Sequence, residues 1–307
     1  MTTTVTPTPA TTSSRRGTGL FRRGKANDAG GGQGAASPLA RSVVWFICFL
    51  WIVPIIGTVI TSFRPEEDAN TNGWWNVFSD PNFTFENFSQ AWSKSGLGDA
   101  FVNSFAIALP ATLIPIMVAA FAAYAFAFMR FPFRDTLFFL IVSLLVVPNY
   151  VAFVPLLQLY GKFNMVGTFP AVWLAHIGFG MSLAIYILRN FMSTLPKEVI
   201  ESAKIDGASH FVTFWRLIVP MSVPALASFA IFQFLWVWND LLTALVFIGP
   251  GDNQPITIAV SQLIGQQQQG WQLVTAGGLI SMIVPVIVFL SLQRFFVRGL
   301  TAGSVKG

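Results

Sequence analysis

Six long apolar stretches, separated by polar segments, make up most of this 307-residue chain. Each is long enough to supply the run of about 20 apolar residues with which a helix crosses the hydrocarbon core of a bilayer. The pattern therefore predicts an all-α integral membrane protein with six transmembrane helices. The predicted spans are residues 43–63, 103–129, 136–160, 170–188, 217–248 and 274–296.

Polar residues interrupt two of these spans, at Pro148-Asn149 and at Asn239-Asp240. Backbone groups at such breaks lose their helical partners and need protein or water in place of lipid. Asn149, Asn239 and Asp240 are therefore candidate polar residues of a translocation path. Two interpretations of Asp240 stay open: an intramembrane carboxylate with a functional role, or a packed polar group hydrogen-bonded to Asn239 or to a partner subunit.

The stretch 196–220, between the fourth and fifth spans, is polar and carries seven ionisable side chains. Ile200 and Ala203 lie on one apolar stripe of a short helix, with charged residues beside them. Gly207 can adopt the left-handed conformation that ends a helix, and Ser209 can cap the next one. The stretch is therefore predicted to form a helix, a sharp turn and a second helix at one face of the membrane.

Composition supports a membrane protein, because 54% of the residues are hydrophobic and 10% are charged, whereas soluble domains carry about 25% charged residues. Residues 1–42 are rich in Thr, Ser, Gly, Ala and Arg, and such a segment is expected to be a disordered tail. Residues 43–297 then form the transmembrane domain, and residues 298–307 form a C-terminal tail.

The basic residues orient the spans, since 15 of the 18 Lys and Arg fall in the termini and in alternate loops. The positive-inside rule places these segments in the cytosol. Both termini and the loop 190–220 are therefore expected to be cytosolic, and no nucleic acid is expected as a partner. The acidic loop 64–100 lies outside, either as a solvated loop with an interfacial aromatic belt or as a docking surface for an external partner.

Residues with the chemistry of a catalytic or cofactor site are scarce. The sequence has no G-x-x-x-x-G-K-[ST] phosphate-binding loop, and its two histidines, His176 and His210, are too few for a metal site. His176, within the fourth span, is expected to be a packed polar residue in preference to a proton relay. We therefore expect no catalytic residue, no metal and no cofactor in this chain.

The stretch 196–220 resembles a known signature. Glu201-Ser202-Ala203, Gly207 and Leu217-x-Val219-Pro220 have the spacing of the E-A-A, G and I-x-L-P positions in permease subunits of ABC importers. Ser202, Leu217 and Val219 depart mildly from that pattern. Further segments resemble the carbohydrate-uptake, maltose-type branch of this family: residues 203–208, Asn103-Ser104, residues 238–240 and residues 303–307. The tail 293–303 resembles the alpha-glucoside transporters within that branch.

The resemblance implies a type I ABC importer permease with a cytosolic coupling helix, in a bacterial cytoplasmic (inner) membrane. It implies four kinds of partner: membrane lipid, a second permease in a heterodimer, two cytosolic subunits that bind ATP, and an extracytoplasmic sugar-binding protein. The residues that it assigns to coupling with the ATPase are Glu201, Ser202, Ala203, Asp206, Gly207 and Pro220.

The alternative function is a secondary transporter driven by an ion gradient. Such a protein is expected to carry intramembrane charges and repeats with broken helices. The predicted spans hold one acidic residue, Asp240, and the sequence shows no clear repeat. The resemblance and this scarcity of charge both favour a sugar-importer permease that relies on partner subunits for ATP hydrolysis.

Overall fold

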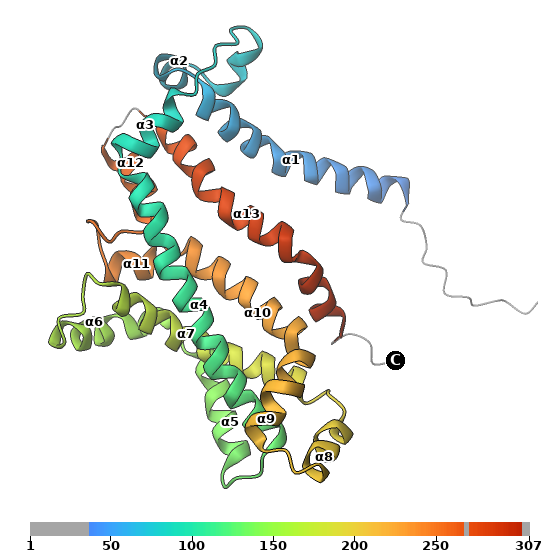
Figure 1. Cartoon of the computed structure of the whole chain (residues 1–307). Helices are drawn as coiled ribbons and strands as arrows, with labels where there is room; N and C mark the ends of the chain where they lie inside the picture. The colour runs from blue at the N-terminus through green and yellow to red at the C-terminus, as the bar shows by residue number, and fades with distance from the viewer. Residues whose placement is uncertain (1–36, 267–269, 303–307) are drawn as a thin grey trace, which may run out of the picture. The chain divides into compact units, whose positions relative to one another are not determined.

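The computed structural model describes residues 37–266 and 270–302, whose regular elements are helices (Figure 1). The rest of the expected tails, residues 1–36 and 303–307, lies outside the described residues. The α-helices are α1 (Pro38–Phe63), α2 (Glu66–Thr71), α3 (Glu86–Lys94), α4 (Leu97–Phe128), α5 (Arg134–Ser143), α6 (Phe153–Lys162), α7 (Phe169–Met192), α8 (Lys197–Ile205), α9 (His210–Thr213), α10 (Val219–Asn239), α11 (Leu242–Phe247), α12 (Ile256–Gln266) and α13 (Trp271–Ala302). The short 3-10 helices are η1 (Trp74–Phe78), η2 (Leu144–Val146) and η3 (Asn149–Ala152), and η4 (Phe214–Ile218) is a π-helix.

The chain forms two compact units, Met1–Phe49 and Leu50–Gly307. The described part of the first unit is the start of α1, and the second unit holds the rest of α1 and the remaining elements. Helix α1 begins at Pro38 because Ser37 caps it, its hydroxyl accepting the Ala40 N–H at 3.2 Å, and proline suits a first helical position. Residues 38–42, which the sequence assigns to the tail, are therefore helical.

Five helices within the described ranges are long and apolar enough to cross a bilayer. They are α1, α4, α7, the continuous helix His210–Asn239 and residues Trp271–Gln293 of α13. The segments Arg134–Val146 and Asn149–Lys162 also pass this test together, but they are bent by 94°. The sequence-predicted spans correspond to these six segments, although most helices extend beyond the predicted limits.

The 94° bend follows from the covalent structure of proline. The residue before a proline is disfavoured in the helical region, and Val147 is extended, with φ −75° and ψ 121°. Pro148 has no N–H to donate, so the helical hydrogen bonds cannot continue across it. The interruption that the sequence indicates at Pro148-Asn149 is therefore a sharp bend.

The second interruption is at Asp240, whose extended backbone, φ −78° and ψ 120°, separates α10 from α11. The fifth predicted span, residues 217–248, thus consists of one long helix and one short one. Its first part contains the π-turn η4 directly before α10. Pro220 lacks an N–H, and a widened turn before such a residue removes the clash with the preceding carbonyl.

A stripe of small residues lets α4 pack closely against α7 and α10. Without a hydrophobic driving force between helices in lipid, close backbone approach through small residues holds a bundle together. The stripe recurs every three or four residues and is buried along its length: Ala100, Ser104, Ala108, Ala111, Pro115, Ala119 and Ala123. Two clusters of buried side chains lie along this seam, one near the α11 end of α7 and one near the α8 end.

The loop between α1 and α4 is part of the second unit and has a buried polar centre. Arg64 is fully buried; its Nη1 donates to the Gly73 carbonyl at 2.8 Å, and its Nη2 lies 3.9 Å from Asp68 Oδ1. The Asn87 amide donates to the Ser62 and Arg64 carbonyls, each at 2.8 Å. These bonds fix α2 and α3, and α3 packs on α13. Whether the acidic face of this loop binds a partner stays a prediction.

The α4–α7 seam leads to a prediction about stability. Replacing Ala119 by leucine inserts three extra carbons at a position that is 0% exposed, and overpacking of this kind costs about 1–3 kcal/mol. We expect Ala119→Leu to lower the temperature at which the detergent-purified protein loses its monodisperse elution by several degrees. The control is Val118→Leu, on the exposed side of the same helix. Equal transition temperatures for the two variants would contradict close packing at this seam.

Candidate functional site

The segment between α7 and α10 forms a helix, a turn and a second helix. In α8, Ile200 and Ala203 are 5% and 6% exposed, while Glu201 and Ser202 are exposed. Ile200 belongs to the same buried cluster as residues of α4 and α7. The apolar stripe of α8 therefore attaches the helix to the bundle, and its polar side is left for other contacts.

The turn after α8 is closed by backbone hydrogen bonds of a Schellman motif. The Ala208 N–H donates to the Ala203 carbonyl at 2.9 Å, and the Gly207 N–H donates to the Lys204 carbonyl at 3.0 Å. Gly207 has φ +74°, as the sequence predicts. A residue other than glycine is strained at this φ, although a Cβ there would meet no atom within 4 Å. The constraint on Gly207 is therefore conformational and not steric.

Helix α9, the second helix of this segment, is held by an N-terminal cap and by a contact with α4. Ser209 caps α9, its Oγ accepting the Val212 N–H at 3.3 Å. His210 Nδ1 lies 2.9 Å from the hydroxyl of Tyr124, a buried residue of α4. α9 continues through η4 into α10, which contains Pro220 in its first turn. The turn after α8 is thereby connected to the long helices α4 and α10.

A groove of about 540 Å³ lies between α8 and the end of α4. Its polar lining is mostly basic and consists of Arg130, Arg134, Lys197, Glu201, Lys204 and His210. The Glu201 side chain has no hydrogen bond or ion pair within the described ranges, so its carboxylate can pair with a group from another molecule. Of the six sequence-predicted coupling residues, four are exposed on this segment (Glu201, Ser202, Asp206 and Gly207), Ala203 is buried, and Pro220 begins α10.

Asp240 lies at the break between α10 and α11 and forms two interactions there. Its Oδ2 is 3.3 Å from His176 Nε2 and accepts the Thr243 N–H at 3.2 Å. His176, on α7, is 1% exposed. The Thr257 hydroxyl donates to the Asp240 carbonyl at 3.1 Å, so the break is tied to α12 as well. This geometry is that of a packed polar group which joins three elements.

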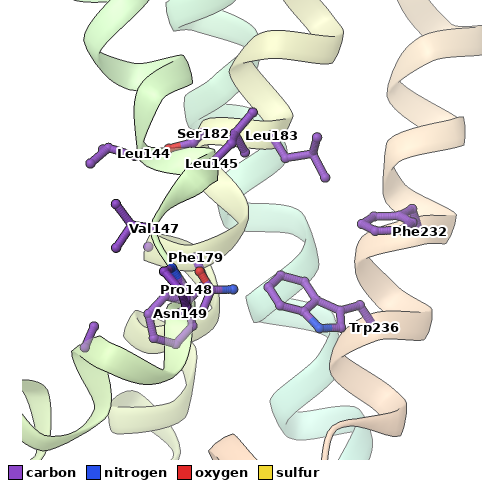
Figure 2. Close-up of a pocket in the computed structure, with 12 residues that line it drawn as sticks. Leu144, Leu145, Val147, Pro148, Asn149, Phe179, Ser182, Leu183, Phe232 and Trp236 are labelled. Atoms are coloured by element: carbon purple, nitrogen blue, oxygen red, sulfur yellow. The ribbon is translucent and has the colours of Figure 1, made fainter.

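The three candidate path residues do not lie together. Asn239 is exposed, and its amide donates to the Leu235 carbonyl one turn back in α10. Asn149 lies instead at the α5–η3 bend, where it lines a pocket of about 350 Å³ (Figure 2). Asp240 is not among the residues that line this pocket. The structure therefore separates Asn149 from Asn239 and Asp240.

The sequence analysis did not single out Trp236, which lines this pocket, or Gln233, one turn earlier on α10. Trp236 lines the pocket from α10, and its ring stands at 84° to the His176 ring with centroids 5.7 Å apart. Gln233 is fully buried and donates to the Ala111 carbonyl at 3.2 Å. Its amide fills the space where a Cβ on Gly180 would lie, 2.7 Å from Gln233 Oε1. The position of Trp236 one turn before Asp240 was the available sequence signal, because residues i and i+4 share a helix face.

Comparison with known proteins identifies the chain. Residues 115–302 match the family described as "Binding-protein-dependent transport system inner membrane component". The osmoprotective compounds uptake permease protein GgtD of Synechocystis is 54% identical, over 85% of this chain and 89% of that one. The alpha-glucoside transport system permease protein AglG of Rhizobium meliloti is 49% identical, over 81% of this chain and 67% of that one.

A solved structure is similar in fold. It is a chain of a bacterial ABC transporter involved in the import of the acidic polysaccharide alginate, with a TM-score of 0.72 and 15% identity over 84% of this chain and 95% of that one. The family match, over residues 115–302, includes the α8 turn and the residues that line the pocket at the bend. This chain therefore belongs to the family of inner membrane components of binding-protein-dependent transport systems.

Proposed function

We propose that the chain is a permease subunit of an ATP-driven ABC importer that carries a sugar or a sugar-like compound across the bacterial inner membrane. The relatives' names support this substrate class: an alpha-glucoside permease at 49% identity and an arabinooligosaccharide permease at 31% identity. GgtD, at 54% identity, is named for osmoprotective compounds. These relatives give no support to the alternative of an ion-gradient-driven secondary transporter.

The other parts of the transporter are proposed as partners. A second, different permease completes the path, two cytosolic subunits bind and hydrolyse ATP, and an extracytoplasmic protein delivers the sugar. The sequence of this chain has no phosphate-binding loop, which is consistent with a permease that holds no cofactor and leaves ATP to its partners. Its own task is then to bind the ATPase and to change shape when the ATPase does.

The observation that carries this proposal is the way α8 is attached. Its inner side is buried through Ile200 and Ala203, and its turn is closed by two backbone hydrogen bonds and a glycine at positive φ. The carboxylate of Glu201 is exposed and unpaired within the described part of the chain. A helix attached in this way can transmit movement. An ATPase that binds its polar face would move α8 together with α4 and α10 as rigid bodies.

The proposed orientation follows from the charges. Basic residues gather at both termini and at the α4–α5 and α7–α10 connections, so these segments are assigned to the cytosol. The loop that contains α2, η1 and α3 is then extracytoplasmic and faces the sugar-binding protein.

Cysteine labelling tests the orientation. In a Cys48→Ser background, a cysteine at Ser79, which is exposed after η1, is expected to react with an impermeant maleimide in intact cells. A cysteine at Ser193, exposed after α7, is expected to react only after the membrane is permeabilised. The opposite pattern would invert the topology and place α8 on the wrong side for an ATPase.

Gly207 provides the test of coupling. Gly207→Val forces a β-branched residue into the left-handed region. This conformation costs a residue other than glycine about 1–2 kcal/mol of conformational free energy. We expect the amount of copurified ATPase and the rate of sugar uptake to fall about five-fold or more, at wild-type membrane levels. Gly207→Asn is the matched control, because asparagine tolerates this conformation, and it should keep most of both activities.

Glu201→Lys tests the polar face of α8 without changing the backbone. The added charge joins a groove that is already mostly basic, so we expect a similar loss of ATPase binding and uptake. If Gly207→Val and Glu201→Lys both copurify normal amounts of ATPase and import sugar normally, α8 is not the coupling element.

Asp240 provides a test of the transport mechanism. Asparagine can still accept the Thr243 N–H and bond to His176, so we expect Asp240→Asn to keep at least half of the uptake. Asp240→Ala leaves both partners without a polar group and should lose more, because an unsatisfied buried group costs about 1–3 kcal/mol. If Asp240→Asn abolishes uptake while ATP hydrolysis and protein levels stay normal, the carboxylate carries a charge in transport.

A further inference from the structure

A pocket of about 350 Å³ lies beside the α5–η3 bend, within the third predicted span. Its walls come from three elements: the bend itself, α7 and α10 (Figure 2). The bend exists because Pro148 cannot continue a helix, and it exposes polar atoms within a predicted span. The lining residues are Leu144, Leu145, Val147, Pro148, Asn149, Ala152, Gly178, Phe179, Ser182, Leu183, Phe232 and Trp236.

Three polar side chains in this lining have no hydrogen-bond partner among residues 37–266 and 270–302. The Asn149 amide, the Ser182 hydroxyl and the Trp236 indole N–H make no hydrogen bond within the described ranges. They come from the bend, from α7 and from α10, and Figure 2 shows the Trp236 ring extending from α10 toward the bend. Because unpaired donors and acceptors are costly at membrane depth, these groups require a polar partner from outside this chain.

The lining is also uncharged: none of its twelve residues is Asp, Glu, Lys, Arg or His. A charged ligand would enter this low-dielectric space without a counter-ion, at a high desolvation cost. The pocket therefore suits a neutral molecule that has both an apolar face and hydroxyl groups. Its volume of about 350 Å³ lies at the lower end of the range of about 300–1,000 Å³ for ligand pockets.

We propose that this pocket binds one ring of a neutral sugar during passage, with the C–H face of the ring stacked on the Trp236 indole. The hydroxyl groups of the ring pair with the Asn149 amide and the Ser182 hydroxyl, and the pocket excludes acidic sugars. The inference rests on the proposed function and extends it by naming the residues of this chain that contact the substrate. It accounts for the aromatic and the polar members of the lining together.

Contacts with His176, and through it with Asp240, fix the orientation of the Trp236 ring. This ring contacts His176, whose Nε2 is 3.3 Å from Asp240 Oδ2. Gln233, one turn earlier on α10, is held by carbonyls of α4 and α7. Asp240 and His176 are thus positioning residues, and Trp236 is the residue that touches the ring. A pre-oriented aromatic side chain loses little conformational freedom on binding.

A side chain of the second permease is the competing occupant. An apolar side chain or a lipid chain would leave the Asn149 amide, the Ser182 hydroxyl and the indole N–H unpaired. A sugar ring satisfies them, because its hydroxyl groups both donate and accept. If the pocket is instead a packing surface, shortening Trp236 has to weaken the complex itself.

The experiment uses the complete transporter in proteoliposomes, with this chain, the second permease, the ATPase and the binding protein. The neutral probes are radiolabelled maltose, trehalose and sucrose, and the acidic probe is an alginate oligosaccharide. We compare wild type with Trp236→Ala, Trp236→Phe and Asn149→Ala. The matched control is Trp271→Ala, a tryptophan that is 58% exposed at the start of α13 and outside the pocket.

Uptake and ATP hydrolysis stimulated by the binding protein are measured in parallel. We expect neutral-sugar uptake to fall at least ten-fold in Trp236→Ala and several-fold in Asn149→Ala, while stimulated ATP hydrolysis stays within two-fold of wild type. Trp236→Phe retains a stacking surface and should recover part of the uptake. Trp271→Ala should import at the wild-type rate. Uptake lost at constant ATP hydrolysis is the signature of a substrate contact and not of a structural defect.

Three results would overturn the inference. Trp236→Ala could import the neutral sugar at the wild-type rate, it could lose the second permease or stimulated ATP hydrolysis together with uptake, or wild type could import the acidic oligosaccharide as fast as a neutral one. A wild-type transporter that assembles but imports no probe of either kind contradicts the proposed function itself. That failure is visible before any variant is compared.

Discussion

Hydrogen bonding of the backbone in lipid is the constraint on which this structure depends. Every N–H and C=O at membrane depth needs a partner, so the described spans are helical along most of their length and are broken at two places. The break at Asp240 is filled by the carboxylate, which accepts the Thr243 N–H. The break at Val147 and Pro148 opens onto a pocket with unpaired polar side chains. Each place where the helical pattern fails is thus a place with specific chemistry.

Close packing through small residues makes the bundle stiff enough to transmit force. The alanine-rich face of α4 meets α7, whose Gly180 leaves room for the buried Gln233 amide. Ile200 of α8 lies in the same buried cluster as α4 and α7 side chains. A protein interior packed in this way moves as a body and does not deform continuously. In the proposed mechanism, a displacement of α8 is therefore shared by the helices on which it rests.

Helix α10 connects the two candidate sites. It follows the α8–α9 turn and η4, and it carries Trp236 and Asn239 in its last turn. Its 21 residues correspond to about 30 Å at 1.5 Å per residue. One continuous helix, His210–Asn239, therefore joins the turn closed by Gly207 to the pocket wall, and the proposed movement of α8 would be carried along it.

The sequence by itself determined the features that arise locally. The length of the apolar stretches predicts the spans, and the missing N–H of Pro148 predicts the break in the third span. The turn after α8 requires a positive φ, which glycine adopts readily, so Gly207 is predicted there. Each of these three features depends only on residues that are neighbours in the sequence. Only the tertiary structure decided which of the candidate polar residues meet. It paired Asp240 with His176, put Asn149 opposite Trp236 and turned Asn239 away. These partners lie on different helices, and helix packing, which sets their rotation and depth, is not encoded in the periodicity of any single segment.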